Sequence, residues 1–282
     1  MIYDRKEQCL KAETEYRQGT VAFLYETVPG RVLLRLAVSP WFSKLWGVYQ
    51  KSPLSRRKIR PFIQKYGVNI DETEVDKFRS FNDFFTRKKA VAVQTDEPYA
   101  LLAVADSKMR YYPITEELQL KIKNCVYDLP DILEDERLAA QYRGGTCIVL
   151  RLSMDDYHRY HFLDDGKLVA SKRIKGVLHT VRSVSEKYRV FARNTRQVSI
   201  LETAHLGQVV QVEIGALLVG KIHNHEKDTF TRMEEKGYFE FGGSTIVLLL
   251  NKEVRFDEDI ANMNDAGIET QVCAGERIGI IC

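Results

Sequence analysis

The chain is poor in cysteine, and the cysteines it has form no recognisable framework. There are five, an odd number, and no two of them are separated by only two residues: Cys9, Cys125, Cys147, Cys273 and Cys282. A scattered, odd set indicates neither a disulfide scaffold nor a zinc knuckle, so a reducing compartment fits best.

Long apolar runs and a strong excess of one charge are missing as well. No uninterrupted apolar stretch approaches the roughly 18 residues that a transmembrane helix requires. The charged residues at 1–7 do not fit a signal peptide. With 42 Lys and Arg against 39 Asp and Glu, the net charge of +3 is too small to indicate binding to nucleic acid. We therefore expect a soluble or peripheral membrane protein with no nucleic-acid partner.

What is present is an ordinary globular composition, with 44% hydrophobic and 29% charged residues in 282. From about Leu101 onward, short β-prone segments alternate with turn signals. We predict an α+β, mainly β fold, in which a β-rich body (79–282) follows a helical region (1–78). A helix is also expected within 127–143. The predicted strands are 101–105, 108–112, 119–123, 146–152, 168–173, 189–191, 197–202, 208–214, 217–222, 237–241, 245–250 and 277–281.

The helical region contains a basic segment that carries both tryptophans. Ser39 and Pro40 are typical of the N-cap and first position of a helix beginning at Trp41. Between residues 20 and 61 there are eight Lys or Arg and one acid, Glu26. Basic amphipathic helices of this kind suit the surface of an anionic membrane. The aromatic stripe could also pack on the body, and the two interpretations are compatible. The stripe consists of Trp41, Phe42, Leu45, Trp46 and Tyr49. Further helical turns are expected over 63–78 and after Ser80.

One stretch of the body has the composition of a reactive turn. The aromatic segment 237–241 is followed by Gly242, Gly243, Ser244 and Thr245 and then by an apolar strand. Adjacent glycines permit positive φ angles and leave the Gly243 carbonyl open to attack by the Ser244 hydroxyl. The alternative is an ordinary hairpin turn or bulge.

Two histidines lie close together after another apolar strand. If His158 and His161 occupy one helical turn, their spacing places both imidazoles on the same face. A metal pair completed by Asp155 or Asp164 is conceivable, but the spacing matches no specific zinc motif and we predict no metal. The remaining interpretations are structural histidines, or a general base with a separate proton donor. Asp106 is placed to orient a histidine.

Several of these stretches, in the same order, resemble the phosphatidylserine decarboxylase family. The resemblance covers roughly residues 78 to 281. Ser107 stands where the family usually has glycine, and Met154 where it often has proline. The matching stretches are 81–87, 105–106, 152–161, 193–196, 214–222, 236–245, 267–270 and 275–277.

The resemblance implies a self-processing enzyme that depends on a pyruvoyl group. Ser244 would attack Gly243 and divide the chain into 1–243 and 244–282, leaving a pyruvoyl group derived from Ser244. The positions of Asp106 and His161 imply activation of the serine, and that of His158 implies help in decarboxylation. The implied reaction is the decarboxylation of phosphatidylserine to phosphatidylethanolamine.

The implied partners are phosphatidylserine, an anionic membrane surface and the chain's own second cleavage product, in a heterodimer that dimerises further. We expect a peripheral protein on the cytoplasmic face of the cell membrane. Three alternatives stay open: a pyruvoyl-dependent decarboxylase of a soluble amino acid, a non-catalytic membrane-binding β module that is never cleaved, and a metal hydrolase using His158 and His161.

Overall fold

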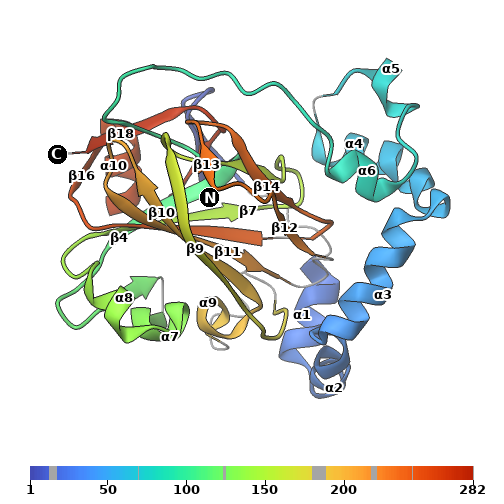
Figure 1. The fold of residues 1–282 in the computed structure, drawn as a ribbon. Helices are drawn as coiled ribbons and strands as arrows, with labels where there is room; N and C mark the ends of the chain where they lie inside the picture. Colours follow the sequence, from blue (N-terminus) through green and yellow to red (C-terminus); the bar gives the residue numbers. More distant parts are fainter. Residues whose placement is uncertain are drawn as a thin grey trace.

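The computed structural model describes residues 1–12, 18–68, 70–122, 125–179, 189–216, 221–242 and 244–281. Figure 1 shows a body of strands with helices α1–α6 gathered to one side of it. Gly243, most of the predicted strand at 217–222, and Cys282 lie outside the described residues.

A ten-stranded sheet forms the centre of the body. Its neighbours are antiparallel except β1 and β17, which run parallel. The strands in spatial order are β13 (Thr229–Phe230), β9 (Gly166–Ile174), β10 (Arg196–Thr203), β11 (Gln208–Gly215), β15 (Ser244–Leu250), β7 (Thr146–Leu152), β4 (Ser107–Pro113), β17 (Glu269–Val272), β1 (Ile2–Asp4) and β2 (Cys9–Lys11).

Both faces of this sheet are covered, which explains why β15 is apolar almost throughout. On one face, Ile246 and Leu248 pack in a core with residues of two three-stranded sheets. These are β12 (Ile222–Asn224), β14 (Glu235–Phe239) and β8 (Arg159–His161), and β16 (Val254–Phe256), β18 (Arg277–Ile281) and β3 (Ala100–Leu102). Helix α10 (Glu258–Asp265) adds Ile260 to the same core.

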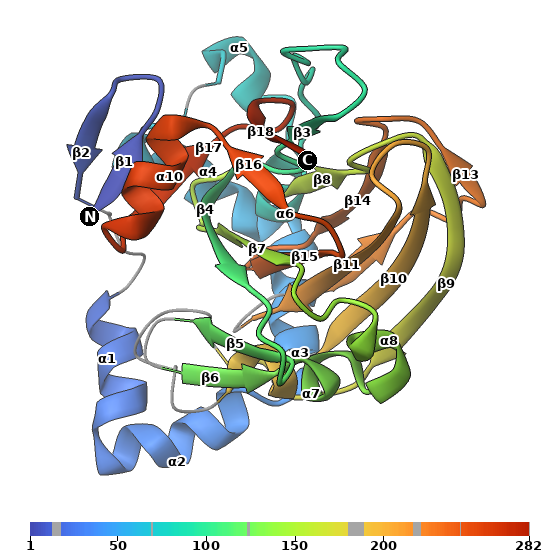
Figure 2. The same ribbon diagram turned by 90° about the vertical axis from the view of Figure 1, so that its left-hand side faces the viewer.

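On the other face, Val247 and Leu249 pack against short helices and a two-stranded sheet. Figure 2 shows these elements beside the long strands. They are α7 (Leu129–Leu133), α8 (Glu136–Ala140), α9 (Val190–Arg193), β5 (Gln119–Ile122) and β6 (Cys125–Asp128).

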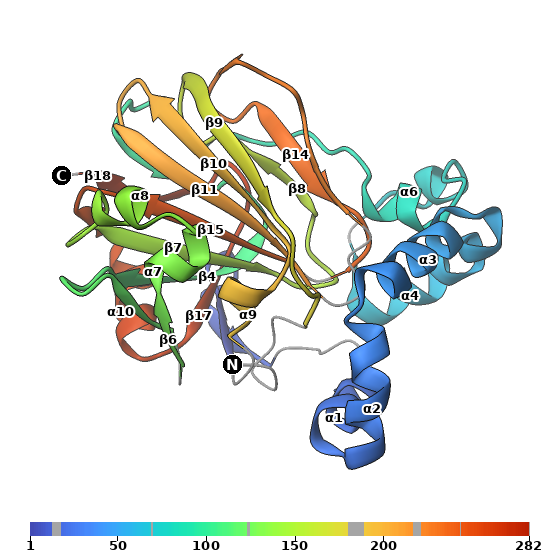
Figure 3. The same ribbon diagram turned by 60° about the horizontal axis from the view of Figure 1, so that its bottom comes forward.

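In the structure the helical region extends beyond residue 78 to α6, and the name is used below in this wider sense. It consists of α1 (Gln18–Glu26), α2 (Val28–Ala37), α3 (Pro40–Lys51), a 3-10 turn (Pro53–Lys58), α4 (Ile59–Tyr66), α5 (Glu72–Val75) and α6 (Phe81–Phe85). The prediction of a cap at Ser39 is confirmed, because its side chain accepts a hydrogen bond from the Trp41 N–H and Pro40 begins α3. Ser80 likewise caps α6 by accepting from the Asp83 N–H. Figure 3 shows the helices on one side of the sheet from a second direction.

An aromatic cluster joins this region to the body. Phe81 and Phe85 of α6 lie edge-on to Phe241 of the body, with ring centroids 5.0 and 5.2 Å apart. Met154 belongs to the same buried cluster. The helical region therefore packs directly on the segment that leads into Gly242.

The expectation of a mixed fold with a sheet-rich body is confirmed, and most of the predicted long strands are present. Residues 190–193 form helix α9, so the strand predicted at 189–191 is wrong. The helix expected within 127–143 is two helices, because Glu134 turns left-handed at φ 50° and Asp135 caps a new one. The helical stretch predicted at 63–78 is likewise divided between α4 and α5.

The sequence predicted no strands at β1 and β2, which join the main sheet although they lie within residues 1–78. The division of the chain at residue 78 stays a prediction. Within the described parts of the chain, no helix combines the length and the apolarity needed to cross a bilayer.

Candidate active site

Ser244 is the first residue of the central strand β15. It lies opposite Gly215 of β11 on one side and Leu152 of β7 on the other. The side chain is fully buried, and its Oγ has no hydrogen-bond partner among the described residues. Gly242, two residues before it, has a φ of 144° that side chains disfavour. A buried, unpartnered hydroxyl at a glycine turn is unusual and points to chemistry rather than to structure.

His158 lies close to this turn and is held as a neutral base. Its Nδ1 lies 3.0 Å from the Asp156 carbonyl oxygen, which can only accept, so Nδ1 carries the proton. Nε2 is then a free acceptor, and it too is buried without a hydrogen-bond partner. Burial lowers the pKa of His158 to about 3, while the Asp156 and Gly242 backbones oppose the shift. The imidazole is therefore uncharged at neutral pH.

An aromatic ring packs directly on His158. The Phe85 ring lies 4.2 Å from the His158 ring, centroid to centroid. The Phe241 N–H donates to Asn82 Oδ1 at 3.3 Å, which ties the segment before Gly242 to α6. The helical region thus contributes both an apolar wall and a polar anchor to the site.

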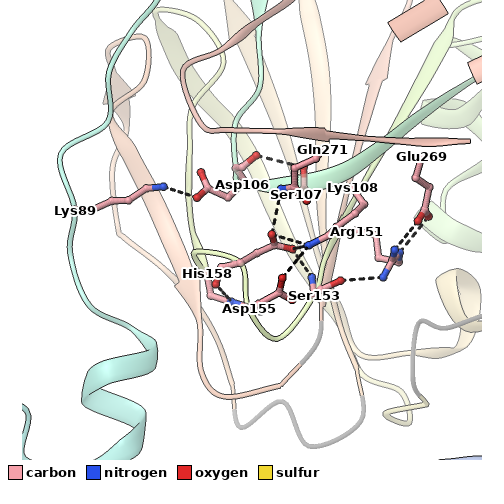
Figure 4. Close-up of polar contacts among 12 residues, drawn as sticks. Lys89, Asp106, Ser107, Lys108, Arg151, Ser153, Asp155, His158, Glu269 and Gln271 are labelled. Carbon is pink, nitrogen blue, oxygen red and sulfur yellow. Dashed lines mark hydrogen bonds and ion pairs between the residues drawn. The ribbon is translucent and has the colours of Figure 1, made fainter. Parts of the chain in front are cut away.

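A buried ion pair fixes the loop that carries His158. Lys108 Nζ of β4 lies 2.8 Å from each carboxylate oxygen of Asp156. Asp156 also accepts from the Ser153 N–H and from Gln271 Nε2. Burial raises the pKa of the Asp156 carboxyl to about 6, against the opposing charge of Lys108. Figure 4 shows Lys108 and Gln271 converging on this loop beside His158.

His161 and Asp106 are near each other but hydrogen-bond to other groups. His161 Nδ1 lies 3.1 Å from the Val104 carbonyl oxygen. Burial lowers the pKa of His161, and the charge of Asp106 is among the groups that oppose this. Asp106 pairs with Lys89 and accepts from the Ala274 N–H at 2.9 Å. Among the residues that the structure describes, no hydrogen bond joins Ser244, His161 and Asp106. Their proposed roles stay predictions.

The helical turn that would place His158 and His161 on one face is not present. Residues 159–161 form strand β8, which pairs with β14, and His158 lies just before this strand, outside any helix. Each imidazole has its own backbone carbonyl partner instead.

A groove opens between the helical region and the body. Its volume is about 710 Å³. Asp106 and Arg87 lie on its wall, and the charge of Arg87 is one of those that lower the pKa of His158. The other lining residues are Tyr66, Gly67, Val68, Ile70, Asp71, Glu74, Lys77, Phe78, Asp83, Thr86, Lys88, Lys89, Asp155, Tyr157 and Arg159.

The sequence analysis did not identify several residues of this site. Lys108 and Asp156, the partners that hold the His158 loop, are 48 positions apart, and no local pattern relates them. Phe85 and Arg87 lie in the stretch 81–87, which was singled out only for its resemblance. Asp156 likewise lies in the resembling stretch 152–161, so the resemblance was the available signal for these three residues.

Comparisons with known proteins show a matching family and relatives similar along most of the chain. The phosphatidylserine decarboxylase family model matches residues 81–280. A Clostridium acetobutylicum protein named phosphatidylserine decarboxylase proenzyme 2 is 45% identical over 99% of this chain and 97% of its own length. Proteins named phosphatidylserine decarboxylase proenzyme from Ruminiclostridium cellulolyticum and Desulfitobacterium hafniense are 39% and 35% identical, over 99% of this chain and 96% and 97% of their own lengths.

Proposed function

The chain belongs to the phosphatidylserine decarboxylase family, and we propose that it converts phosphatidylserine to phosphatidylethanolamine with release of CO₂. It is accordingly an enzyme, a carboxy-lyase. The observation that carries the proposal is the similarity along 99% of the chain to proteins with this name. Those names also contain the word proenzyme, which supports a precursor that is cleaved.

We propose that Ser244 is the source of a pyruvoyl group, formed when its hydroxyl attacks the Gly243 carbonyl. The buried, unpartnered Oγ and the positive φ of Gly242 support this assignment. A pyruvoyl ketone supplies an electrophilic carbonyl that accepts the electron pair released with CO₂. The apolar rings of Phe85 and Phe241 keep water from the site where this occurs.

The remaining roles follow the resemblance. We assign Asp106 and His161 to activation of Ser244 and His158 to proton transfer during decarboxylation. His158 suits a proton-transfer role because its Nε2 is unpartnered and its Nδ1 is fixed by the Asp156 carbonyl.

We further propose that α2 and α3 bind the surface of an anionic membrane. Their large exposed apolar side chains include Leu36 and Trp41, which are 66% and 71% exposed. Arg31 and Arg35 are exposed on α2, so cations lie beside these apolar groups, as in interfacial helices. The substrate is a lipid, and a peripheral position on the cytoplasmic face of the cell membrane follows from this proposal.

The proposal is tested by the intact mass of the freshly purified protein under denaturing conditions, beside Ser244→Ala. We expect the wild type to give two fragments that divide between Gly243 and Ser244. The smaller should carry a blocked, ketone-reactive N-terminus, and Ser244→Ala should stay whole. The wild type should release CO₂ from phosphatidylserine vesicles and not from free serine. A whole wild-type chain without this activity would refute the proposal.

A further inference from the structure

Arg87 is a charged residue of the groove wall that lies close along the chain to the side chain packed on His158. It lies on the groove wall, directly after α6. Phe85, two residues before it, packs on the His158 ring with centroids 4.2 Å apart, and the charge of Arg87 is one of those that lower the pKa of His158. An anion carried by a substrate in this groove can therefore contact Arg87 beside the His158 site.

The guanidinium has no acidic partner. Its described contacts are a hydrogen bond from Nη1 to the Phe84 carbonyl at 3.2 Å and a position 4.9 Å from the centre of the Phe84 ring. Within the described residues, no carboxylate lies at ion-pair distance from Arg87. Two neighbouring cations on the same wall do have partners, since Lys89 pairs with Asp106 and Arg159 with Glu235.

A partly buried cation without a counter-ion is unfavourable in the free protein. Burial lowers the pKa of Arg87, although electrostatic interactions with Tyr157 and Asp106 oppose the shift. Among the described residues, Arg87 is thus a partly buried positive charge on the groove wall without an ion-pair partner. Such a charge is complementary to an anion that arrives with the substrate.

We propose that Arg87 binds the phosphodiester of the lipid substrate and so positions the serine headgroup toward His158. A guanidinium matches phosphate oxygens with two parallel N–H donors. This inference rests on the proposed function, because it takes phosphatidylserine as the molecule that occupies the groove.

The substrate also carries a carboxylate, and the chemistry favours the phosphodiester as the partner. The carboxylate loses its charge as CO₂, so pairing it with Arg87 would stabilise the ground state more than the transition state and slow the reaction. The phosphodiester keeps its charge throughout, so binding it costs nothing at the chemical step. The apolar surroundings of Phe85 and Phe241 suit a carboxylate that leaves as a neutral molecule.

The test compares Arg87→Met and Arg87→Lys with the wild type, all as full chains, on phosphatidylserine in mixed detergent micelles. For Arg87→Met we expect normal self-cleavage, a KM raised roughly tenfold to a hundredfold and a kcat close to that of the wild type. Arg87→Lys should recover part of the affinity, because a lysine keeps the charge without the paired donors. Arg79→Gln, which removes an exposed arginine outside the groove, is the matched control and should leave all values unchanged.

Glycerophosphoethanolamine, which has the phosphodiester but no carboxylate, distinguishes the two anions. Its binding, followed by calorimetry, should weaken in Arg87→Met by about the same factor as the KM rises. If it binds both forms equally while the KM rises, Arg87 contacts the carboxylate and the proposal is overturned. An unchanged KM would overturn it as well.

A thermal melt separates this role from a structural one. Because the unpaired charge is unfavourable, Arg87→Met should melt no lower than the wild type, and a clearly lower Tm together with lost activity would overturn the inference. Failure of the proposed function is seen separately, in a wild type that does not cleave or release CO₂. Even then, loss of glycerophosphoethanolamine binding in Arg87→Met would uphold the phosphodiester site, and unchanged binding would overturn it.

Discussion

At the scale of single residues, the site is defined by polar atoms that burial leaves without partners. Ser244 Oγ and His158 Nε2 are both buried and lack a hydrogen-bond partner among the described residues, and both lie at the turn around Gly242. Leaving such groups unsatisfied typically costs 1–3 kcal/mol each, so they are retained for a reason other than stability. Burial also keeps His158 neutral, because the surrounding rings and the charges of Arg87 and Lys108 disfavour the imidazolium.

The two histidines should separate in function when each is replaced by alanine. We expect His161→Ala to remain a whole chain, since activation of Ser244 is lost. We expect His158→Ala to be cleaved but to turn over phosphatidylserine at least a hundredfold more slowly, the usual scale of proton-transfer catalysis. Denaturing gels report the cleavage, and CO₂ release reports the turnover.

His225→Ala serves as the control, because His225 is exposed and its described side-chain contacts are an ion pair with Glu235 and a ring contact with Tyr238. It should cleave and turn over normally. The reverse pattern, with His158→Ala whole and His161→Ala cleaved, would exchange the two roles. Because His158 lies near Gly242, the exchange of these two roles is the alternative that the experiment must exclude.

At the scale of elements, α3 divides its apolar residues between the body and the solvent. Trp46 packs against the aromatic cluster of α4 and α6, and Lys51 pairs with Glu240 at 2.7 Å. These contacts hold one side of α3 on the body. Trp41, Leu45 and Val48 are left exposed on it. Exposed apolar side chains on a helix that is fixed to the body are suited to an interface rather than to a core.

Replacing these exposed groups should weaken membrane binding without harming the fold. We expect Leu36→Glu combined with Trp41→Glu to reduce sedimentation with phosphatidylserine vesicles at least tenfold, because two apolar contacts are lost and two like charges face the lipid. Val169→Glu on β9, which replaces another exposed apolar residue, is the control and should sediment like the wild type. Equal sedimentation of all three proteins would contradict the membrane proposal.

At the scale of the whole molecule, the proposed cleavage point lies at the centre of the main sheet. Strand β15 would open the smaller product, and its seven residues are all buried between β11 and β7. Strand β17 of the same product pairs with β4 and β1. Cutting the chain before Ser244 therefore breaks one covalent bond and leaves both ladders in place.

The two products should accordingly behave as one particle. We expect the cleaved protein to elute from size exclusion as a complex containing both chains, and to separate only in denaturant, because separation would expose the cores on both sides of β15. Native mass spectrometry gives the stoichiometry, including any further dimer. A smaller chain that dissociates in ordinary buffer would contradict this arrangement.

The sequence by itself determined what depends on neighbouring residues. Ser39 and Ser80 are in register with the first N–H groups of their helices, so the caps could be predicted. The apolar runs at 146–152 and 245–250 could be recognised as strands because their residues are buried on both faces. The glycine pair before Ser244 predicted a reactive turn from neighbouring residues as well, and this stays a prediction.

Only the tertiary structure decided what depends on residues far apart in the chain. Pairing with β14 made 159–161 a strand and overrode the helical spacing of the two histidines. The parallel contact of β1 with β17 and the ion pair of Lys108 with Asp156 join segments that no periodicity relates. Arg87 acquired its proposed role in the same way. Its charge is visible in the sequence, but the lack of a counter-ion and the nearness of His158 exist only once the helical region has packed on the body.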